Sequence, residues 1–186
     1  MKARPVVAFV AFVVLALGLA ACAGPGPYGY ARTYAPTSGE EAATKDAVPL
    51  DPAMLGEPAL AHGKPVVFFG VVQRRGAASR PTDGVVLVVS LRRMEDRNLC
   101  ESAQSERTCR VTVSDAAFGE TSVVVQLAGD DDAGEHAVGP GSLVRVVGAV
   151  GGAFDETGAP LVKATWYRHW PHGQYVTRAH ADVLRQ

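Results

Sequence analysis

Residues 84–92 read Gly-Val-Val-Leu-Val-Val-Ser-Leu-Arg, a pattern that indicates the fold class. Aliphatic residues occupy every second position, while Ser90 and Arg92 fall on the opposite face. A period of two residues is that of a β-strand with one apolar face, because successive side chains of a strand point to opposite sides. The residues of this apolar row are Val85, Leu87, Val89 and Leu91.

Four other runs share this β-rich character and are bounded by Gly, Pro or Asp. Gly70 and Gly148 interrupt two of them, at positions where a missing side chain allows a strand to coil or bulge. Five such strands predict an all-β fold, a small five-stranded antiparallel OB-like barrel. The four further runs are Pro65 to Gln73, Ser122 to Leu127, Ser142 to Val150 and Pro160 to Arg168.

Composition agrees with a turn-rich β protein that forms one domain. The chain has 186 residues, of which 47% are hydrophobic and 7% aromatic, with 20 Gly and 12 Pro. The Gly- and Asp-rich segment from Gly151 to Gly158 predicts an antiparallel hairpin between the fourth and fifth runs.

The N-terminus carries a lipoprotein signal. Lys2 and Arg4 precede an apolar run that ends in Leu-Ala-Ala-Cys at residues 19–22, a lipobox whose cysteine receives the lipid. The apolar run from Val6 to Ala21 is shorter than the roughly 20 residues that span a bilayer. We therefore expect residues 1–21 to be removed and Cys22 to be lipidated, with palmitate as one acyl chain. Two or more acyl chains give stable membrane attachment. Ala23 after the cysteine favours the outer membrane, with the domain facing the periplasm.

Three further segments follow the leader. Residues 22–62 are rich in Gly, Pro, Ala and Thr without an apolar period, which predicts a disordered tether behind the lipidated cysteine. Residues 63–171 hold the β domain, and residues 172–186 form a tail in which a short helix is one option. Removal of the leader leaves 16 of the 18 basic side chains against 19 acidic ones. This mild negative charge makes a nucleic-acid partner unfavourable.

Cys100 and Cys109 remain as a pair once Cys22 is acylated. In an oxidising compartment they are expected to form a disulfide that closes an insertion between the second and third strands. The alternative is a redox-active or metal-binding thiol pair, but the spacing lacks the C-x-x-C pattern that tunes thiolates.

Other chemically capable residues carry no recognisable catalytic or metal motif. Pro171 separates His169 from His172, so these two histidines and His180 are expected to lie at the surface. Three adjacent acids, residues 130–132, lack the alternation of a calcium loop. We predict no catalytic residue, metal or cofactor, and no ligand-binding residue is identified.

Strand alternation also predicts the inner face of the barrel. Val85, Leu87, Val144 and Val146 are expected to form an inner row. In the fifth run, Val162, Ala164 and Trp166 are expected to point inward, and Lys163 and Thr165 toward water. Trp166 and Trp170 are expected to close a barrel end. The apolar outer face is left for a partner or the tail to cover.

Three blocks follow one another along the domain: residues 63–72 (GKPVVFFGVV), residues 139–148 (GPGSLVRVVG), and Pro160 to Ala164 followed by His169-Trp170-Pro171. In this order they resemble the Slp family of bacterial outer-membrane lipoproteins. The resemblance covers Gly63 to about Pro171, behind the lipobox. It implies an outer-membrane, periplasm-facing β domain linked to starvation and stress adaptation, and no established catalytic residues. The cysteine-containing insertion and the tail lie outside it.

The expected function is therefore that of a non-enzymatic envelope lipoprotein. Its lipid partner would be the outer membrane, through acylated Cys22, and its β domain would contact an envelope protein or stabilise the envelope. The alternative is an OB-type module that binds an oligosaccharide or single-stranded nucleic acid. Against it, the strands that carry such sites offer mainly Val86, Val88, Val124 and Gln126.

Overall fold

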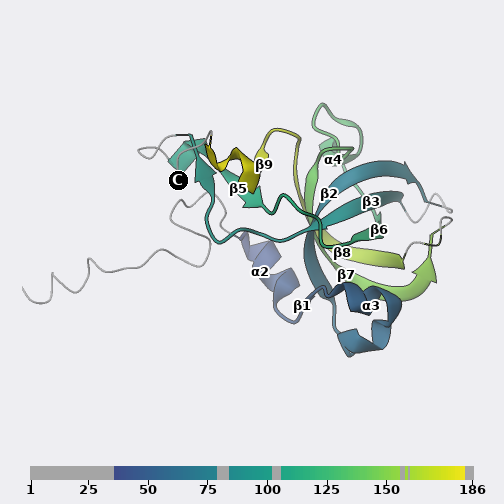
Figure 1. Ribbon diagram of the computed structural model, residues 1–186. Helices are drawn as coiled ribbons and strands as arrows, with labels where there is room; N and C mark the ends of the chain where they lie inside the picture. Colours follow the sequence, from purple (N-terminus) through teal and green to yellow (C-terminus); the bar gives the residue numbers. More distant parts are fainter. Residues whose placement is uncertain (1–35, 79–83, 102–105, 156–157, 159, 183–186) are drawn as a thin grey trace, which may run out of the picture.

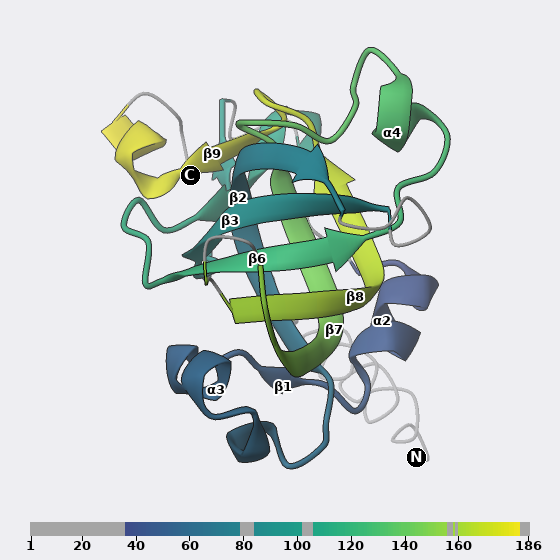
Figure 2. The same cartoon turned by 90° about the vertical axis from the view of Figure 1, so that its right-hand side faces the viewer.

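The computed structural model describes residues 36–78, 84–101, 106–155, 158 and 160–182. Five strands close into a barrel, as the sequence predicted. The short helices α3 (Pro52–Gly56) and α4 (Asp130–Ala133) lie at opposite ends of this barrel (Figures 1 and 2). The barrel strands are β2 (Val66–Ala77), β3 (Val85–Arg92), β6 (Glu120–Val125), β7 (Leu143–Phe154) and β8 (Pro160–Trp170).

The strand order around the barrel is β2-β3-β6-β8-β7, and β7 pairs with β2 to close it. Four of the five pairings are antiparallel, including the predicted β7–β8 hairpin. The fifth differs from the all-antiparallel prediction because β6 and β8 run parallel. Strand β8 lies between β6 and β7 in the sheet. It is antiparallel to β7 and therefore runs in the same direction as β6.

The barrel interior is filled by the rows that strand alternation predicted. Leu87, Val144 and Val146 are each 1% exposed, and Val85 packs against them with partial exposure. Val162 is fully buried in the same cluster, and Ala164 packs against it. The inner row is therefore confirmed up to Ala164.

The predicted inward position of Trp166 is wrong because β8 contains a bulge. Val147 pairs with Trp166 but Gly148 pairs with Ala164, so Thr165 is the extra residue. The bulge reverses the alternation: Tyr167 packs against the barrel core, and Trp166 lies half-buried on the outer face. A β-carbon on Gly148 would lie 2.4 Å from the carbonyl oxygen of Lys163, so the bulge requires glycine there.

The expectation of a disordered tether is wrong for residues 36–62. This segment forms α2 (Ser38–Thr44), β1 (Val48–Pro49), α3 (Pro52–Gly56) and η2 (Pro58–Ala61), and β1 pairs with β2. Helices α2 and α3 each span only one or two turns, so neither shows a long apolar period. Side-chain caps fix their first turns: the Thr37 hydroxyl accepts from Glu40 N–H at 3.2 Å, and the Asp51 carboxylate accepts from Ala53 N–H at 2.9 Å. The residues this segment buries against the barrel are Leu50, Leu55 and Ala61.

The insertion and the tail together form a second sheet. Strand β5 (Cys109–Val113) pairs with β4 (Leu99–Cys100) on one side and in parallel with β9 (Tyr175–Thr177) on the other. The tail then continues as η5 (Arg178–Asp182), a 3₁₀-helix. Hydrogen bonds from Thr177 and from Ala179 N–H hold the pKa of Asp115 below its ordinary value, which ties the tail to the insertion.

The second sheet covers part of the outer face of the barrel, formed by β2, β7 and β8, and a second apolar cluster lies between them. Phe69, Leu143 and Trp170 extend outward from β2, β7 and β8, and Val111 and Val113 of β5 pack onto them. The ring centroids of Phe69 and Trp170 lie 6.1 Å apart. Trp170 thus sits between the two layers rather than at a barrel end, and the tail covers the outer face together with the insertion.

Cys100 and Cys109 form the predicted disulfide, which joins β4 to β5. Replacing both by serine is expected to lower the free energy of unfolding by about 2 to 3 kcal/mol, because the unfolded chain regains the freedom of the closed loop. Urea unfolding of wild-type and variant protein measures this, and reduced wild type serves as a control that should lose as much. An unchanged midpoint in the variant would show that the sheet is held without the bridge.

Candidate functional site

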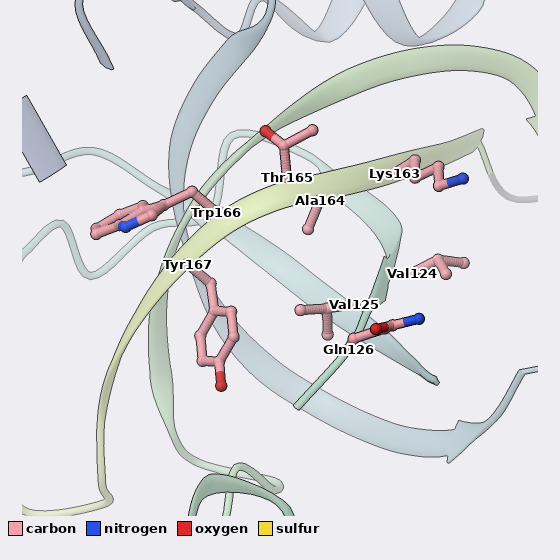
Figure 3. Close-up of a pocket in the computed structure, with 8 residues that line it drawn as sticks. All are labelled: Val124, Val125, Gln126, Lys163, Ala164, Thr165, Trp166 and Tyr167. Carbon is pink, nitrogen blue, oxygen red and sulfur yellow. The ribbon is translucent and has the colours of Figure 1, made fainter. Parts of the chain in front are cut away.

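A pocket opens in the barrel wall where β6 and β8 separate. The ladder between these strands ends at the pair of Val124 with Lys163, and beyond it β8 turns away to follow β7. The cavity, which we call the seam pocket, measures about 490 Å³ (Figure 3). That volume lies within the range of small-ligand pockets. Its lining is two continuous strand segments, Val124 to Gln126 and Lys163 to Tyr167.

The seam pocket combines an apolar floor with a polar rim. Val125 is buried and Ala164 and Tyr167 are half-buried, whereas Lys163 and Gln126 are exposed. Figure 3 shows Trp166 and Tyr167 on opposite sides of β8, so only the tyrosine ring points to the interior side. A β-carbon on Gly39 would lie 4.0 Å from Trp166 Nε1, which places α2 beside the indole.

Tyr167 is fixed at the pocket floor by a carboxylate of the short helix α4 (Asp130–Ala133). Its hydroxyl donates to Asp131 Oδ2 at 2.9 Å. Burial, followed by this hydrogen bond, raises the pKa of Tyr167 to about 12, so the hydroxyl stays protonated at neutral pH. The hydroxyl is therefore already occupied, and the ring is what a ligand meets.

Asp131 also holds His169, and Arg75 holds the same helix through Asp132. His169 Nδ1 lies 3.1 Å from Asp131 Oδ1, and the imidazole is 5% exposed, so its predicted surface position is wrong. His172 and His180 are exposed as expected. Arg75 pairs with Asp132 and donates to Val138 O at 3.0 Å. Within the described chain His169 Nε2 is buried without a partner, so solvent does not reach that nitrogen.

A second charged cluster docks α2 (Ser38–Thr44) on the outer face of the barrel. Glu40 is 0% exposed and forms ion pairs with Arg145 and with Arg168, the latter at 3.0 Å. The guanidinium of Arg145 lies 5.1 Å from the Phe69 ring, and that of Arg168 4.7 Å from the Trp170 ring. Each arginine thus has an anionic and an aromatic neighbour, an arrangement that favours a structural role.

A second cavity of about 620 Å³ lies between β1 and the end of β3. Phe68 and Phe69 contribute to it, and across it Arg93 stacks over Phe118 at 5.4 Å. Its side chains come from four separate segments, residues 48–54, 67–69, 92–94 and Phe118. The seam pocket is therefore the better-defined candidate site.

Other predicted site residues fall outside these cavities. Cys22 lies outside the described residues. Asp130, Asp131 and Asp132 begin the short helix α4 (Asp130–Ala133), and Asp131 and Asp132 bind protein groups. In the described ranges no group of three or more His, Cys, Asp or Glu residues is arranged to hold a metal ion. Likewise, no helix in that part of the chain has the length and apolar character needed to cross a membrane.

Comparison with family models, curated proteins and solved structures finds no match for this chain. The resemblance to the Slp family therefore stays a prediction, based on the three sequence blocks alone.

Proposed function

We propose that this protein is an envelope lipoprotein, anchored in the outer membrane through Cys22, whose β domain is a non-enzymatic binding module in the periplasm. The observation that carries the proposal is the lipobox at residues 19–22 directly ahead of a domain with a disulfide. Disulfides persist in oxidising compartments such as the periplasm. The Slp-like blocks support the same location.

The attachment of α2 shortens the distance between lipid and domain. Only residues 23–35 separate Cys22 from the first described residue, Pro36. Even a fully extended segment of that length reaches no more than about 50 Å. The binding module would therefore work close to the membrane surface, and its partner would be an envelope component within that reach.

Replacing Cys22 by serine is expected to abolish lipid attachment, because only the thiol accepts the diacyl group. Cells fed a clickable fatty acid should label the wild-type protein and leave the variant unlabelled as uncleaved precursor. The double serine variant at Cys100 and Cys109 is the matched control and should still be labelled. Normal labelling of the Cys22 variant would refute the anchor.

A second candidate function is an OB-type module for an oligosaccharide or single-stranded nucleic acid. The observation that favours the oligosaccharide is the position of Trp166 on the outer face of β8, near the exposed Lys163, rather than in the core. The acidic balance of the mature chain opposes nucleic acid. Glycan arrays and salt-dependent binding to a single-stranded oligonucleotide test the two ligands separately.

A further inference from the structure

We propose that the seam pocket binds an extended peptide segment, which adds as a strand to the edge of β8. This inference deepens the proposed binding function by naming the chemical class of the partner.

The first argument is the edge itself. Strand β8 runs from Pro160 to Trp170, but its ladder with β6 covers only Leu161 to Lys163. Among the described strands, none pairs with this edge at Ala164 to Tyr167, the β8 residues that line the pocket after Lys163. Along Ala164 to Tyr167 the N–H and C=O groups that face away from β7 can serve as a template for another strand.

The second argument is how the pocket is lined. Every lining residue belongs to one of two continuous segments. The first is Val124 to Gln126, at the end of β6 and just after it, and the second is Lys163 to Tyr167 of β8. A ligand in this space lies along strand backbone on both sides. An extended peptide matches that surface, because its own N–H and C=O groups repeat with the same spacing. An oligosaccharide lacks alternating N–H donors and C=O acceptors along its chain, so the lining favours the peptide.

The third argument is the chemistry of the side chains at this edge. Val125, Ala164 and the ring of Tyr167 offer an apolar floor for one side chain, and the Tyr167 hydroxyl is already bound to Asp131. At the rim, Lys163 is exposed and its ammonium group favours an acidic neighbour. Since side chains of a strand alternate, the peptide is expected to place an apolar residue inward and an acidic residue outward.

The test uses the full-length lipidated protein in detergent micelles and a displayed library of random ten-residue peptides. A selected peptide is synthesised with N-methyl groups at every second position, in both possible sets. One set should weaken binding about tenfold and the other should have little effect, because only alternate N–H groups face the β8 edge. Equal effects of the two sets would overturn strand addition.

Two matched pairs of variants locate the site. Gln126→Trp, at the pocket mouth, should weaken peptide binding about tenfold or more. Gln73→Trp, at an exposed position of β2, should leave peptide binding unchanged. Lys163→Glu should shift the preference from acidic to basic peptides, and Arg74→Glu should leave it unchanged. All four positions are exposed, so melting temperatures should stay near wild type.

Failure of each idea gives a different result. A lipid-labelled protein that selects no peptide, or whose peptides ignore the Gln126 variant, overturns the strand-addition site and leaves the envelope proposal in place. Binding of an array glycan that is lost in Gln126→Trp would replace the peptide by an oligosaccharide. Peptide binding by a protein that takes no lipid would overturn the anchor alone.

Discussion

Replacing Glu40 by alanine is expected to lower the free energy of unfolding by about 3 to 5 kcal/mol, because it leaves two partly buried guanidinium groups without their anion. Glu40 is 0% exposed, and the side chains of Arg145 and Arg168 are 16% and 28% exposed. For a domain of this size the loss corresponds to a melting temperature lower by roughly 10 °C. Calorimetry or circular dichroism on the chain lacking the leader measures it.

Glu41 provides a matched control on the same helix. Its side chain is exposed, so Glu41→Ala should change the free energy of unfolding by no more than about 0.5 kcal/mol. Because Glu40 holds α2 to β7 and β8, its loss should also speed proteolysis within residues 36–47 before the barrel unfolds. If Glu40→Ala melts like Glu41→Ala, the helix does not depend on this carboxylate for docking.

Replacing Tyr167 by alanine is expected to cost about 3 kcal/mol, because it removes ring packing in the barrel core and the hydrogen bond to Asp131. Trp166→Ala should cost about 1 kcal/mol, since the indole is half-buried on the outer face. Lys163→Ala, at an exposed position, should have almost no effect. Thermal melts of the three variants measure the order of their losses in stability.

This order differs from the one that strict alternation predicts for β8, where Trp166 points inward. A larger loss for Trp166→Ala than for Tyr167→Ala would mean that Thr165 is not bulged and that the regular register is right. Tyr167→Phe separates the two contributions, because it keeps the ring and removes only the hydroxyl. This variant should lose about 1 kcal/mol of the roughly 3 kcal/mol lost by Tyr167→Ala.

The short helices α2 and α3, which strand alternation did not predict, had a local sequence signal. Thr37 followed by Glu40, and Asp51 followed by Pro52, are typical helix starts, and both act as such in the structure. Short helices without an apolar period were nevertheless not expected in a Gly- and Pro-rich segment. The burial of Glu40 had no signal at all, because its two arginines lie more than a hundred residues further along the chain.

The seam pocket shows the same limit. Val124, Gln126, Lys163 and Trp166 were each considered from the sequence, but as residues of separate strands. Their meeting depends on the parallel pairing of β6 with β8 and on its end at Lys163. Strand order around a barrel follows from which edges remain for pairing once the hairpins have formed, so no single stretch of sequence contains it.

The amino-acid sequence alone predicts the five strands, their inner rows up to Ala164, the β7–β8 hairpin and the disulfide partners. These features depend on side-chain alternation, turn residues and cysteine number, all of which are local or compositional. The bulge at Thr165, the docking of α2 and the second sheet on the outer face depend instead on tertiary contacts. Each of these requires close approach of distant segments, such as Gly148 against the Lys163 carbonyl or Glu40 against Arg168, and the energy of such contacts exists only once the chain has folded.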